Sequence, residues 1–518
     1  MAGEVRQLAV IDVGTTSIRL AVAQVGADGV PRLFAQARQN VALGDDVFTT
    51  GQISPQTTEN SIGVLRLFLR HLAEYGIPAD AAHLRVVATS AVREARNRET
   101  FIDRVFAATG LEVVMIEEAE LSRYIYLGVQ SFRSDPALSQ SPDTLVVEVG
   151  GGATDVLALH QGKVVFTQEH SLGSLRLWQL RDAAGLSTRG RREVMEAHIL
   201  RFTELLVSGY TEAARRGVQV LALGGDARFA ATRLRPGWEA GRLVALPVAD
   251  LARLAEEILQ ESTDDLVRRY GMTYPEAETL GAALLTYVRL AQAFGREQLC
   301  VTAVSMRDGV LVDMATSSVG DGVFAEQIVN AALVLAEKYG VDMPHVQHVT
   351  EISLVLFDAL LAEHRLTPRD RLILKVAGLL HELGMFVNTR SHHKYSMYLI
   401  LNSDIFGLGT WDRELAALVA RYHRRSHPLI THEVYNTLSR ERRLTVGKLS
   451  AILRVADALD RSHSHQVRIK SVEIRDGELR LMVTGLADPA LERLALRQKA
   501  GLFTEVYGLN VVLCPLPG

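Results

Sequence analysis

Two short stretches rich in glycine and threonine each follow an apolar run that ends in an acid. Residues 12–17 read DVGTTS, and residues 148–155 read EVGGGATD. Because glycine has no Cβ, the backbone N–H groups of such a turn can converge on an anion, and phosphate oxygens suit these nests. A carboxylate does not bind phosphate directly, but it can hold Mg²⁺ or a water molecule beside it. The two stretches therefore predict phosphate-binding turns, each with a metal-binding acid.

The two stretches are copies of one internal repeat. A shift of 136 residues pairs Asp12 with Glu148 and Gly14 with Gly150. Each copy reads as strand, acid, tight turn and strand, so two copies would face each other across a cleft; the alternative is a pair of structural hairpins. The predicted acids are Asp12, Glu148 and Asp155. The predicted phosphate-binding residues are Gly14, Thr15, Thr16, Ser17, Gly150, Gly151, Gly152 and Thr154.

The elements that must position these turns change character along the chain. Up to about residue 320, short β-rich runs such as LAVIDVG and LVVEVGG alternate with amphipathic stretches, which predicts α/β architecture. Long helical periods follow and predict a helical domain, and the last ~50 residues return to strand-like alternation. The predicted domains are 1–128, 129–318, 319–465 and 466–518.

Size and composition exclude several classes of protein. A chain of 518 residues is too long for one hydrophobic core, and two cysteines, Cys300 and Cys514, provide no disulfide framework. No apolar run approaches the ~18 residues of a membrane helix, and the sequence MAGEVRQLAVID lacks the features of a secretion signal, so we expect a cytoplasmic protein without a membrane partner. The net charge of −4 attracts no polyanion globally, so nucleic acid is not an expected partner and an anionic substrate needs local basic clusters.

Seven motifs resemble, in order, those of the exopolyphosphatase / guanosine pentaphosphate phosphohydrolase family. They are DVGTTSIRL, ATSAVREARN, YIYLGV, VEVGGGATD, SLGSLRL, ALGGDARFAA and MRDGVL. The N-terminal part of that family belongs to the actin–Hsp70–sugar kinase superfamily, and the resemblance covers about residues 6–315. It implies an α/β fold of two actin-like (RNase H-like) lobes, followed by an all-α HD-type domain and a small α/β C-terminal tail.

The resemblance also implies an activity, namely hydrolysis of a terminal phosphoanhydride with Mg²⁺. Inorganic polyphosphate is the leading expected substrate, guanosine pentaphosphate is the alternative, and a homodimer is expected. Arg93 matches the arginine of the TSAxR motif, which would stabilise charge on the transferred phosphoryl group. The alternative for Arg93 is a residue of a surface helix start.

One departure from the family places catalysis in question. The family usually has a glutamate that positions the attacking water where this chain has Leu121, and leucine can neither orient nor deprotonate water. Glu120 is the predicted replacement, with Glu117 and Glu118 as alternatives; otherwise the protein is a catalytically silent sensor of phosphate or a nucleotide. Further departures are Glu148, Ala153, Asp155 and Asp226, where the family usually has Asp, Ser, Glu and a neutral residue.

The helical region contains residues in the order of His-Asp metal phosphohydrolases. The predicted metal ligands are His348, His381, Glu382 and Asp457, and imidazole and carboxylate groups suit such a metal. This region would then be a second hydrolase acting on a nucleotide; the alternative is a structural relic that lines a channel. The candidates for contacting a long anionic chain are His392, His393, Lys394, Arg421, His423, Arg424 and Arg425.

Overall fold

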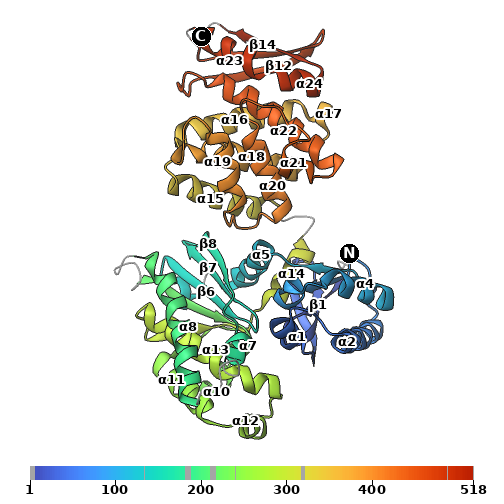
Figure 1. Cartoon of the computed structure of the whole chain (residues 1–518), viewed down its shortest axis with the longest axis vertical. Helices are drawn as coiled ribbons and strands as arrows, with labels where there is room; N and C mark the ends of the chain where they lie inside the picture. Colours follow the sequence, from blue (N-terminus) through green and yellow to red (C-terminus); the bar gives the residue numbers. More distant parts are fainter. Residues whose placement is uncertain are drawn as a thin grey trace. The chain divides into compact units, whose positions relative to one another are not determined.

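The computed structural model describes residues 6–132, 135–139, 141–180, 188–210, 217–239, 241–316, 321–486 and 488–516. The chain forms two compact units, Met1–Gly322 and Val323–Gly518 (Figure 1). The division lies near the predicted boundary at residue 318.

The first unit contains two β-sheets, and the first of these has the order β3-β2-β1-β4-β5. The strand β2 is antiparallel to both β1 and β3, whereas β4 and β5 continue the sheet in parallel with β1. The bounds are β1 (Arg6–Val13), β2 (Ser17–Val25), β3 (Pro31–Asn40), β4 (Leu84–Ala88) and β5 (Val113–Met115).

The second sheet repeats this arrangement. Its order is β10-β11-β9-β6-β7-β8, with β6, β7 and β8 antiparallel and with β9 and β11 parallel to β6. The antiparallel strand β10 is added at the edge. The duplicated topology confirms the predicted pair of α/β lobes. The bounds are β6 (Asp143–Val149), β7 (Thr154–His160), β8 (Lys163–His170), β9 (Gln219–Leu223), β10 (Val244–Pro247) and β11 (Gln298–Val301).

Both sheets are built around strands that are buried on both faces. In β1 every residue from Leu8 to Val13 is buried, and in β9 all five residues are buried. Such strands need continuous apolar sequence because helices or other elements cover each face. Each sheet has a separate hydrophobic core, so the lobes are distinct packing units.

Two helices link the lobes. The helix α5 (Glu118–Val129) connects the first sheet to the second and packs against β7 and β8. The helix α14 (Met306–Thr316) follows the second sheet in sequence but packs on α5 and β1 (Figure 1). A Cβ added to Gly309 in α14 would lie 1.7 Å from the carbonyl oxygen of Tyr124, so the two helices touch at their backbones. The predicted range 129–318 for the second lobe therefore includes a helix that packs on the first.

The second unit confirms the predicted helical region. Within it, α16 packs against α18 and α22, and α20 packs against both of these and α19. The helices are α15 (Asp321–Lys338), α16 (Met343–Ala359), α18 (Pro368–Leu380), α19 (His392–Leu401), α20 (Thr410–Arg421) and α22 (Arg440–Leu459). The C-terminal segment adds a three-stranded sheet, ordered β12-β13-β14, and two helices that pack on α22. They are β12 (Arg468–Arg475), β13 (Glu478–Thr484), α23 (Ala490–Lys499), α24 (Gly501–Tyr507) and β14 (Asn510–Pro515).

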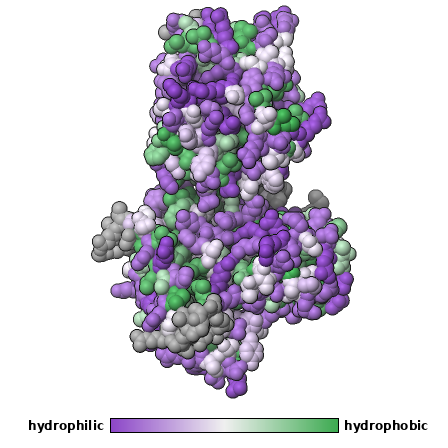
Figure 2. Space-filling view, viewed as in Figure 1, coloured by the Kyte–Doolittle hydropathy of each residue, from purple (hydrophilic) through white to green (hydrophobic). Residues whose placement is uncertain are grey.

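Apolar side chains are scattered over the visible surface. On the face shown in Figure 2, small hydrophobic patches lie among hydrophilic residues in both units. Within the described part of the chain, no helix combines the length and the hydropathy needed to cross a membrane.

Candidate functional site

A cavity of about 360 Å³ lies in the first unit at the ends of β1 and β6. Both Gly/Thr turns line it, as do the predicted acids Asp12, Glu148 and Asp155. Of the predicted phosphate-binding residues, all line the cavity except Thr154. Its hydroxyl instead donates to the carbonyl oxygen of Leu172 at 2.5 Å, and the residue is fully buried. The structure therefore places the Thr154 side chain outside the cavity that the other predicted residues line.

The two turns are closed by equivalent hydrogen bonds. Gly14 N–H donates to the carbonyl oxygen of Ser17 at 3.1 Å, and Gly150 N–H donates to that of Ala153 at 2.8 Å. The N–H groups of the residues inside each turn take no part in these bonds. Gly173 approaches the second turn so closely that a Cβ would lie 2.1 Å from the carbonyl oxygen of Gly151. The backbone just before the helix α7 (Ser174–Leu180) therefore packs directly against this turn.

Strand pairing places charged residues in one row on each sheet. Asp12 on β1 is paired with Arg19 on β2, which is paired with Arg38 on β3. Residues paired across strands point to the same face of a sheet. These three side chains all line the cavity, so the first lobe presents one acid and two arginines.

The equivalent row on the second sheet is entirely acidic. Glu148 on β6 is paired with Asp155 on β7, which is paired with Glu169 on β8. All three side chains line the same cavity. The cavity is therefore bounded by a row rich in arginine on one sheet and by a row of carboxylates on the other.

Further arginines come from the starts of two helices. Arg228 belongs to α10 (Gly225–Leu234), and Arg307 lies in the first turn of α14, where its Nη1 is 3.0 Å from Oδ2 of Asp12. Burial, and then the neighbouring Arg307, lowers the pKa of Arg19 to about 10. Burial and Arg307 also lower the pKa of Arg228. Guanidinium groups that lower one another's pKa in this way repel one another, and a bound anion would reduce that repulsion.

Burial and neighbouring carboxylates likewise disfavour the charged forms of acids in the cavity. Burial raises the pKa of Glu148, although Arg228 and Arg307 oppose the shift. Burial, and then the carboxylates of Glu169 and Glu148, raises the pKa of Asp155 well above its ordinary value. Among the described residues, Oδ1 of Asp12 is buried without a hydrogen-bond partner. A divalent cation would satisfy that oxygen and relieve the crowding, so the donor set fits Mg²⁺.

One wall of the cavity is apolar. Phe229 of α10 lies there with Met272, Pro275 and Leu280, which come from the start of α13 (Tyr274–Ala293) and the residues before it. Glu276 of the same helix also lines the cavity and forms an ion pair with Arg38. Burial raises the pKa of Asp226, at the start of α10, to about 6. This part of the cavity therefore offers apolar area and carboxylates rather than cations alone.

The predicted catalytic residue Glu120 does not line the cavity. Its carboxylate accepts a hydrogen bond from Glu117 N–H at 3.3 Å and forms the capping box of α5, and burial raises its pKa. The side chain of α5 that lines the cavity is Leu121, which is 7% exposed. The motif spacing thus located the position facing the cavity, but the structure places the neighbouring carboxylate at the start of the helix.

Arg93 does not line the cavity but contacts Glu169, which does. Its Nη2 lies 2.5 and 2.6 Å from the two carboxylate oxygens of Glu169, and its Nη1 donates to the carbonyl oxygen of Ile116 at 3.0 Å. Glu169 lines the cavity, whereas Arg93 is behind it. Direct contact between Arg93 and a bound phosphate, as the resemblance implies, would require this ion pair to open.

Sequence reasoning missed Glu169 and four arginines of the cavity. Arg38 is placed there by the pairing of β2 with β3. Arg19, Arg228 and Arg307 all occur within motifs that carry the resemblance, namely DVGTTSIRL, ALGGDARFAA and MRDGVL. A search of those motifs for cations would have found them. Glu169 follows from the register of β7 and β8, which no local pattern reveals.

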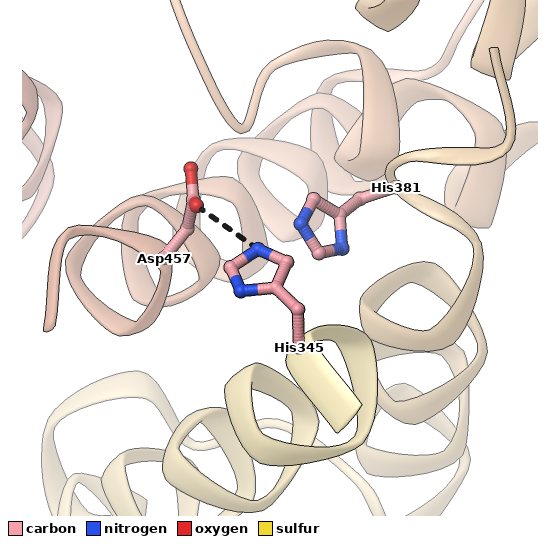
Figure 3. Close-up of side chains that lie close together, drawn as sticks. All are labelled: His345, His381 and Asp457. Carbon is pink, nitrogen blue, oxygen red and sulfur yellow. Dashed lines mark ion pairs between the residues drawn. The ribbon is translucent and has the colours of Figure 1, made fainter. Parts of the chain in front are cut away.

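The second unit holds a cluster of metal-ligating side chains. His345, His381 and Asp457 come from α16, the end of α18 and α22, and their ligand atoms lie within 4.8 Å of one another (Figure 3). His345 Nδ1 lies 2.8 Å from Asp460 Oδ2, and His381 Nδ1–H donates to the carbonyl oxygen of Gly378 at 2.7 Å. Both Nε2 atoms are buried, and among the described residues neither has a hydrogen-bond partner. Such orientation by the second nitrogen is typical of metal-binding histidines.

The sequence predicts His348 as a ligand, but the histidine of α16 that belongs to this cluster is His345. Nδ1 of His348 accepts a hydrogen bond from the Arg468 guanidinium at 3.1 Å, so a cation already lies against the ring. His348 lies about one helical turn beyond His345 on α16, and its ring faces the strand β12. Glu382 is close to the cluster, with Oε1 3.9 Å from His345 Nε2. The Lys499 ammonium forms an ion pair with Asp457 and competes with a metal for that carboxylate.

A cavity of about 270 Å³ adjoins this cluster and is strongly basic. It is lined by Arg424, Arg425, Arg454, Arg461 and Lys499, together with Asp457, Glu382 and three histidines. Burial would raise the pKa of Asp457, but Lys499, His423 and His381 hold it below its ordinary value. The cavity is therefore suited to an anion.

Only some of the candidates for contacting a long anionic chain line this cavity. His392, His423, Arg424 and Arg425 line it, whereas His393, Lys394 and Arg421 do not. Burial, and then Arg424, lowers the pKa of His393 to about 4, so this histidine is neutral near pH 7 and contributes no charge.

The duplicated α/β lobes, with a Gly/Thr turn in each copy and a cavity lined by both turns, define a protein of actin-like fold. Sequence comparison identifies the family. The profile described as the Ppx/GppA phosphatase family matches residues 21–318, and that described as Ppx/GppA phosphatase, domain III, matches residues 329–500. The chain belongs to the Ppx/GppA phosphatase family.

Individual relatives are distant but cover most of the chain. The chain is 24% identical over 520 residues to a Guanosine-5'-triphosphate,3'-diphosphate pyrophosphatase of Photobacterium profundum, with 96% of each chain covered. It is 22% identical to the protein of the same description from Aliivibrio fischeri, with 86% of each covered.

Solved structures match about three fifths of the chain. An exopolyphosphatase from Cytophaga hutchinsonii aligns with a TM-score of 0.53 and 21% identity, covering 60% of this chain and 98% of that one. A Ppx/GppA family member from Aquifex aeolicus aligns with a TM-score of 0.50 and 23% identity, covering 61% and 100%. At these identities the likeness supports the fold.

Proposed function

We propose that the cavity of the first unit hydrolyses the terminal phosphoanhydride bond of guanosine pentaphosphate. The observation that carries this proposal is the meeting of two phosphate-loop turns, a row rich in arginine and a row of acids around one cavity. Membership of a phosphatase family supports the reaction class, and the description of the curated relatives as pyrophosphatases of this nucleotide supports the substrate.

The apolar wall favours a nucleotide over inorganic polyphosphate. Phe229, Met272 and Leu280 offer area that a purine ring can cover, whereas a polyphosphate chain has no apolar part. Glu276 on the same wall provides a carboxylate acceptor, which matches the N–H donors on the edge of a guanine ring. The apolar part of the wall therefore supports the nucleotide as the proposed substrate.

Different residues of the cavity have different roles in the proposed phosphoryl transfer. The backbone N–H groups inside the two turns, with Arg19 and Arg307, bind the phosphate oxygens and neutralise charge that develops in the transition state. Asp12, Glu148 and Asp155 would hold Mg²⁺, which stabilises charge on the phosphate oxygens when bound. Because these donors are fixed by paired strands and by the start of α14, little reorganisation is needed during the reaction.

The test is phosphate release by the purified protein with Mg²⁺ from guanosine pentaphosphate and from long-chain polyphosphate, at equal concentrations of terminal phosphate. We expect release from guanosine pentaphosphate, with a KM that rises at least tenfold in Phe229→Ala. The matched control is Phe106→Ala, because Phe106 is 50% exposed on the helix Arg98–Thr109. Release from polyphosphate alone would assign the substrate that the sequence favoured, and release from neither would overturn hydrolysis.

A second proposal concerns the helical unit. We propose that His345, His381 and Asp457 hold a divalent transition metal, because their ligand atoms converge while the other nitrogen of each ring is occupied. The adjoining basic cavity would place an anion next to such a metal. A metal-dependent nucleotide hydrolase in this unit is the corresponding function.

A further inference from the structure

Leu121 leaves the hydrolytic reaction without the carboxylate that the family resemblance expects on α5. Leu121 lines the cavity and Glu120 is held in the capping box of its own helix. Hydrolysis nevertheless needs a group that takes a proton from the attacking water. The following inference rests on the proposed function and concerns which residue supplies that group.

Glu169 places a carboxylate in the cavity that Leu121 also lines. The strand β8, which carries Glu169, packs against α5, which carries Leu121, and both side chains line the same cavity. The Glu169 side chain is 9% exposed, and the Arg93 guanidinium contacts both of its oxygens at 2.5 and 2.6 Å. Arg93 is in turn fixed by the carbonyl oxygen of Ile116 at 3.0 Å. The carboxylate is therefore held in one orientation at the wall of the cavity.

Glu169 differs from the other acids of the cavity in that its cationic partner, Arg93, does not itself line the cavity. Asp12 is bound by Arg307, and Glu276 is bound by Arg38. Asp226 lies among Arg19 and Arg228. Glu148 and Asp155 are assigned to Mg²⁺ in the proposed function. The acids that line the cavity are Asp12, Glu148, Asp155, Glu169, Asp226 and Glu276.

We propose that Glu169 orients and deprotonates the attacking water, in place of the glutamate that α5 lacks. A bond forms between the water oxygen and the terminal phosphorus, and the bond from that phosphorus to the bridging oxygen breaks. The water proton passes to the Glu169 carboxylate, and the leaving phosphate chain keeps the electron pair of the broken bond. Arg93 is a positioning residue, because it fixes Glu169 and does not line the cavity.

The experiment compares phosphate release by wild type, Glu169→Gln and the double variant Glu169→Gln/Leu121→Glu, with guanosine pentaphosphate and Mg²⁺. Glutamine keeps the size of the side chain but cannot accept a proton, so we expect kcat to fall by 10²–10⁴-fold with KM unchanged. In the double variant a carboxylate enters the same cavity from α5, and we expect at least a tenfold recovery of kcat. The matched control is Glu204→Gln, which removes an exposed acid of the helix Thr188–Ser208.

Two further readouts separate catalysis from folding and from metal binding. Thermal midpoints of all variants should agree with that of the wild type, and the Mg²⁺ concentration for half-maximal rate should be unchanged in Glu169→Gln. A shift of that concentration by tenfold or more would make Glu169 a metal ligand and would overturn the proposal.

Different results would overturn the role of Glu169 and the proposed function. If wild type and Glu169→Gln release phosphate at equal rates, the function stands and the role of Glu169 is overturned. Loss of activity in Glu120→Gln with activity retained in Glu169→Gln would return the role to Glu120. A wild-type protein that binds the nucleotide but releases no phosphate overturns the function and this role together.

Discussion

Nη1 of Arg307 lies 3.0 Å from Oδ2 of Asp12, although 295 residues separate the two in sequence. The contact joins the last helix of the first unit to its first strand. It also places a guanidinium at the carboxyl end of β1, next to the first Gly/Thr turn. The arginine, the acid and the turn therefore line the same cavity.

Replacing Arg307 by Met should lower kcat/KM for phosphate release by about 10- to 100-fold, since a hydrogen bond to a charged group contributes roughly 1.5–3 kcal/mol. Arg307→Lys should recover part of the loss because the positive charge is retained. The control is Arg201→Met, which removes an exposed arginine of the helix Thr188–Ser208. An unchanged kcat/KM in Arg307→Met would contradict the assignment of Arg307 to phosphate binding.

Asp226→Asn should stabilise the first unit at neutral pH. Burial raises the pKa of Asp226 from 3.8 to about 6, so the folded state holds this proton more tightly than the unfolded state does. Wild-type stability therefore falls as pH rises from about 4 through 6, and the loss is complete above that range. The variant lacks this loss, which amounts to at most about 3 kcal/mol.

Urea denaturation of wild type and Asp226→Asn at pH 4, 6 and 8 measures this effect. The difference in unfolding free energy should be smallest at pH 4 and largest at pH 8. A difference that is constant across these pH values would show that Asp226 titrates normally.

Gly309→Ala should destabilise the first unit by roughly 1–3 kcal/mol, the usual cost of overpacking. The added Cβ would lie 1.7 Å from the carbonyl oxygen of Tyr124, and backbone atoms cannot move aside as a flexible side chain can. Gly63→Ala is the matched control in the helix Pro55–Glu74, because a Cβ there meets no atom within 4 Å and alanine favours helix. Thermal denaturation should therefore shift the two variants in opposite directions, and equal shifts would argue against the close contact of α5 and α14.

Zn²⁺ or Mn²⁺ binding by the full-length protein tests the cluster in the second unit. Bound metal should be lost in His381→Ala and in His345→Ala, whereas His348→Ala should retain it. Lys499→Met should bind metal at least tenfold more tightly, because the ammonium group no longer neutralises Asp457. Calorimetric titration, checked by elemental analysis, measures these affinities. Wild-type protein that takes up no metal would leave the cluster a structural feature.

The features predicted correctly from the sequence are local ones. The turns around Gly14 and Gly150 were recognised because the strand, acid and glycine pattern lies within a few residues. Leu121 was placed at the cavity because motif spacing along one helix fixes which side faces inward.

Features that depend on distant pairing were not predicted. The row from Glu148 to Glu169 requires the register of three strands, and the contact of Arg307 with Asp12 requires α14 to return to the first sheet. His345 and His348 are three residues apart on one helix, and either could have joined the cluster until the packing of α16 against α18 and α22 was known.

Because α14 returns to the first sheet, two segments of the chain connect the lobes. The chain crosses between them once through α5 and again at the start of α14, and the two crossings are locked together where Gly309 meets Tyr124. Two connections fixed to each other would restrict rotation of one lobe about the other more than a single connection would. Opening and closing of the cavity would therefore be more restricted in direction, and the arginine at the head of α14 would move with the first lobe rather than the second.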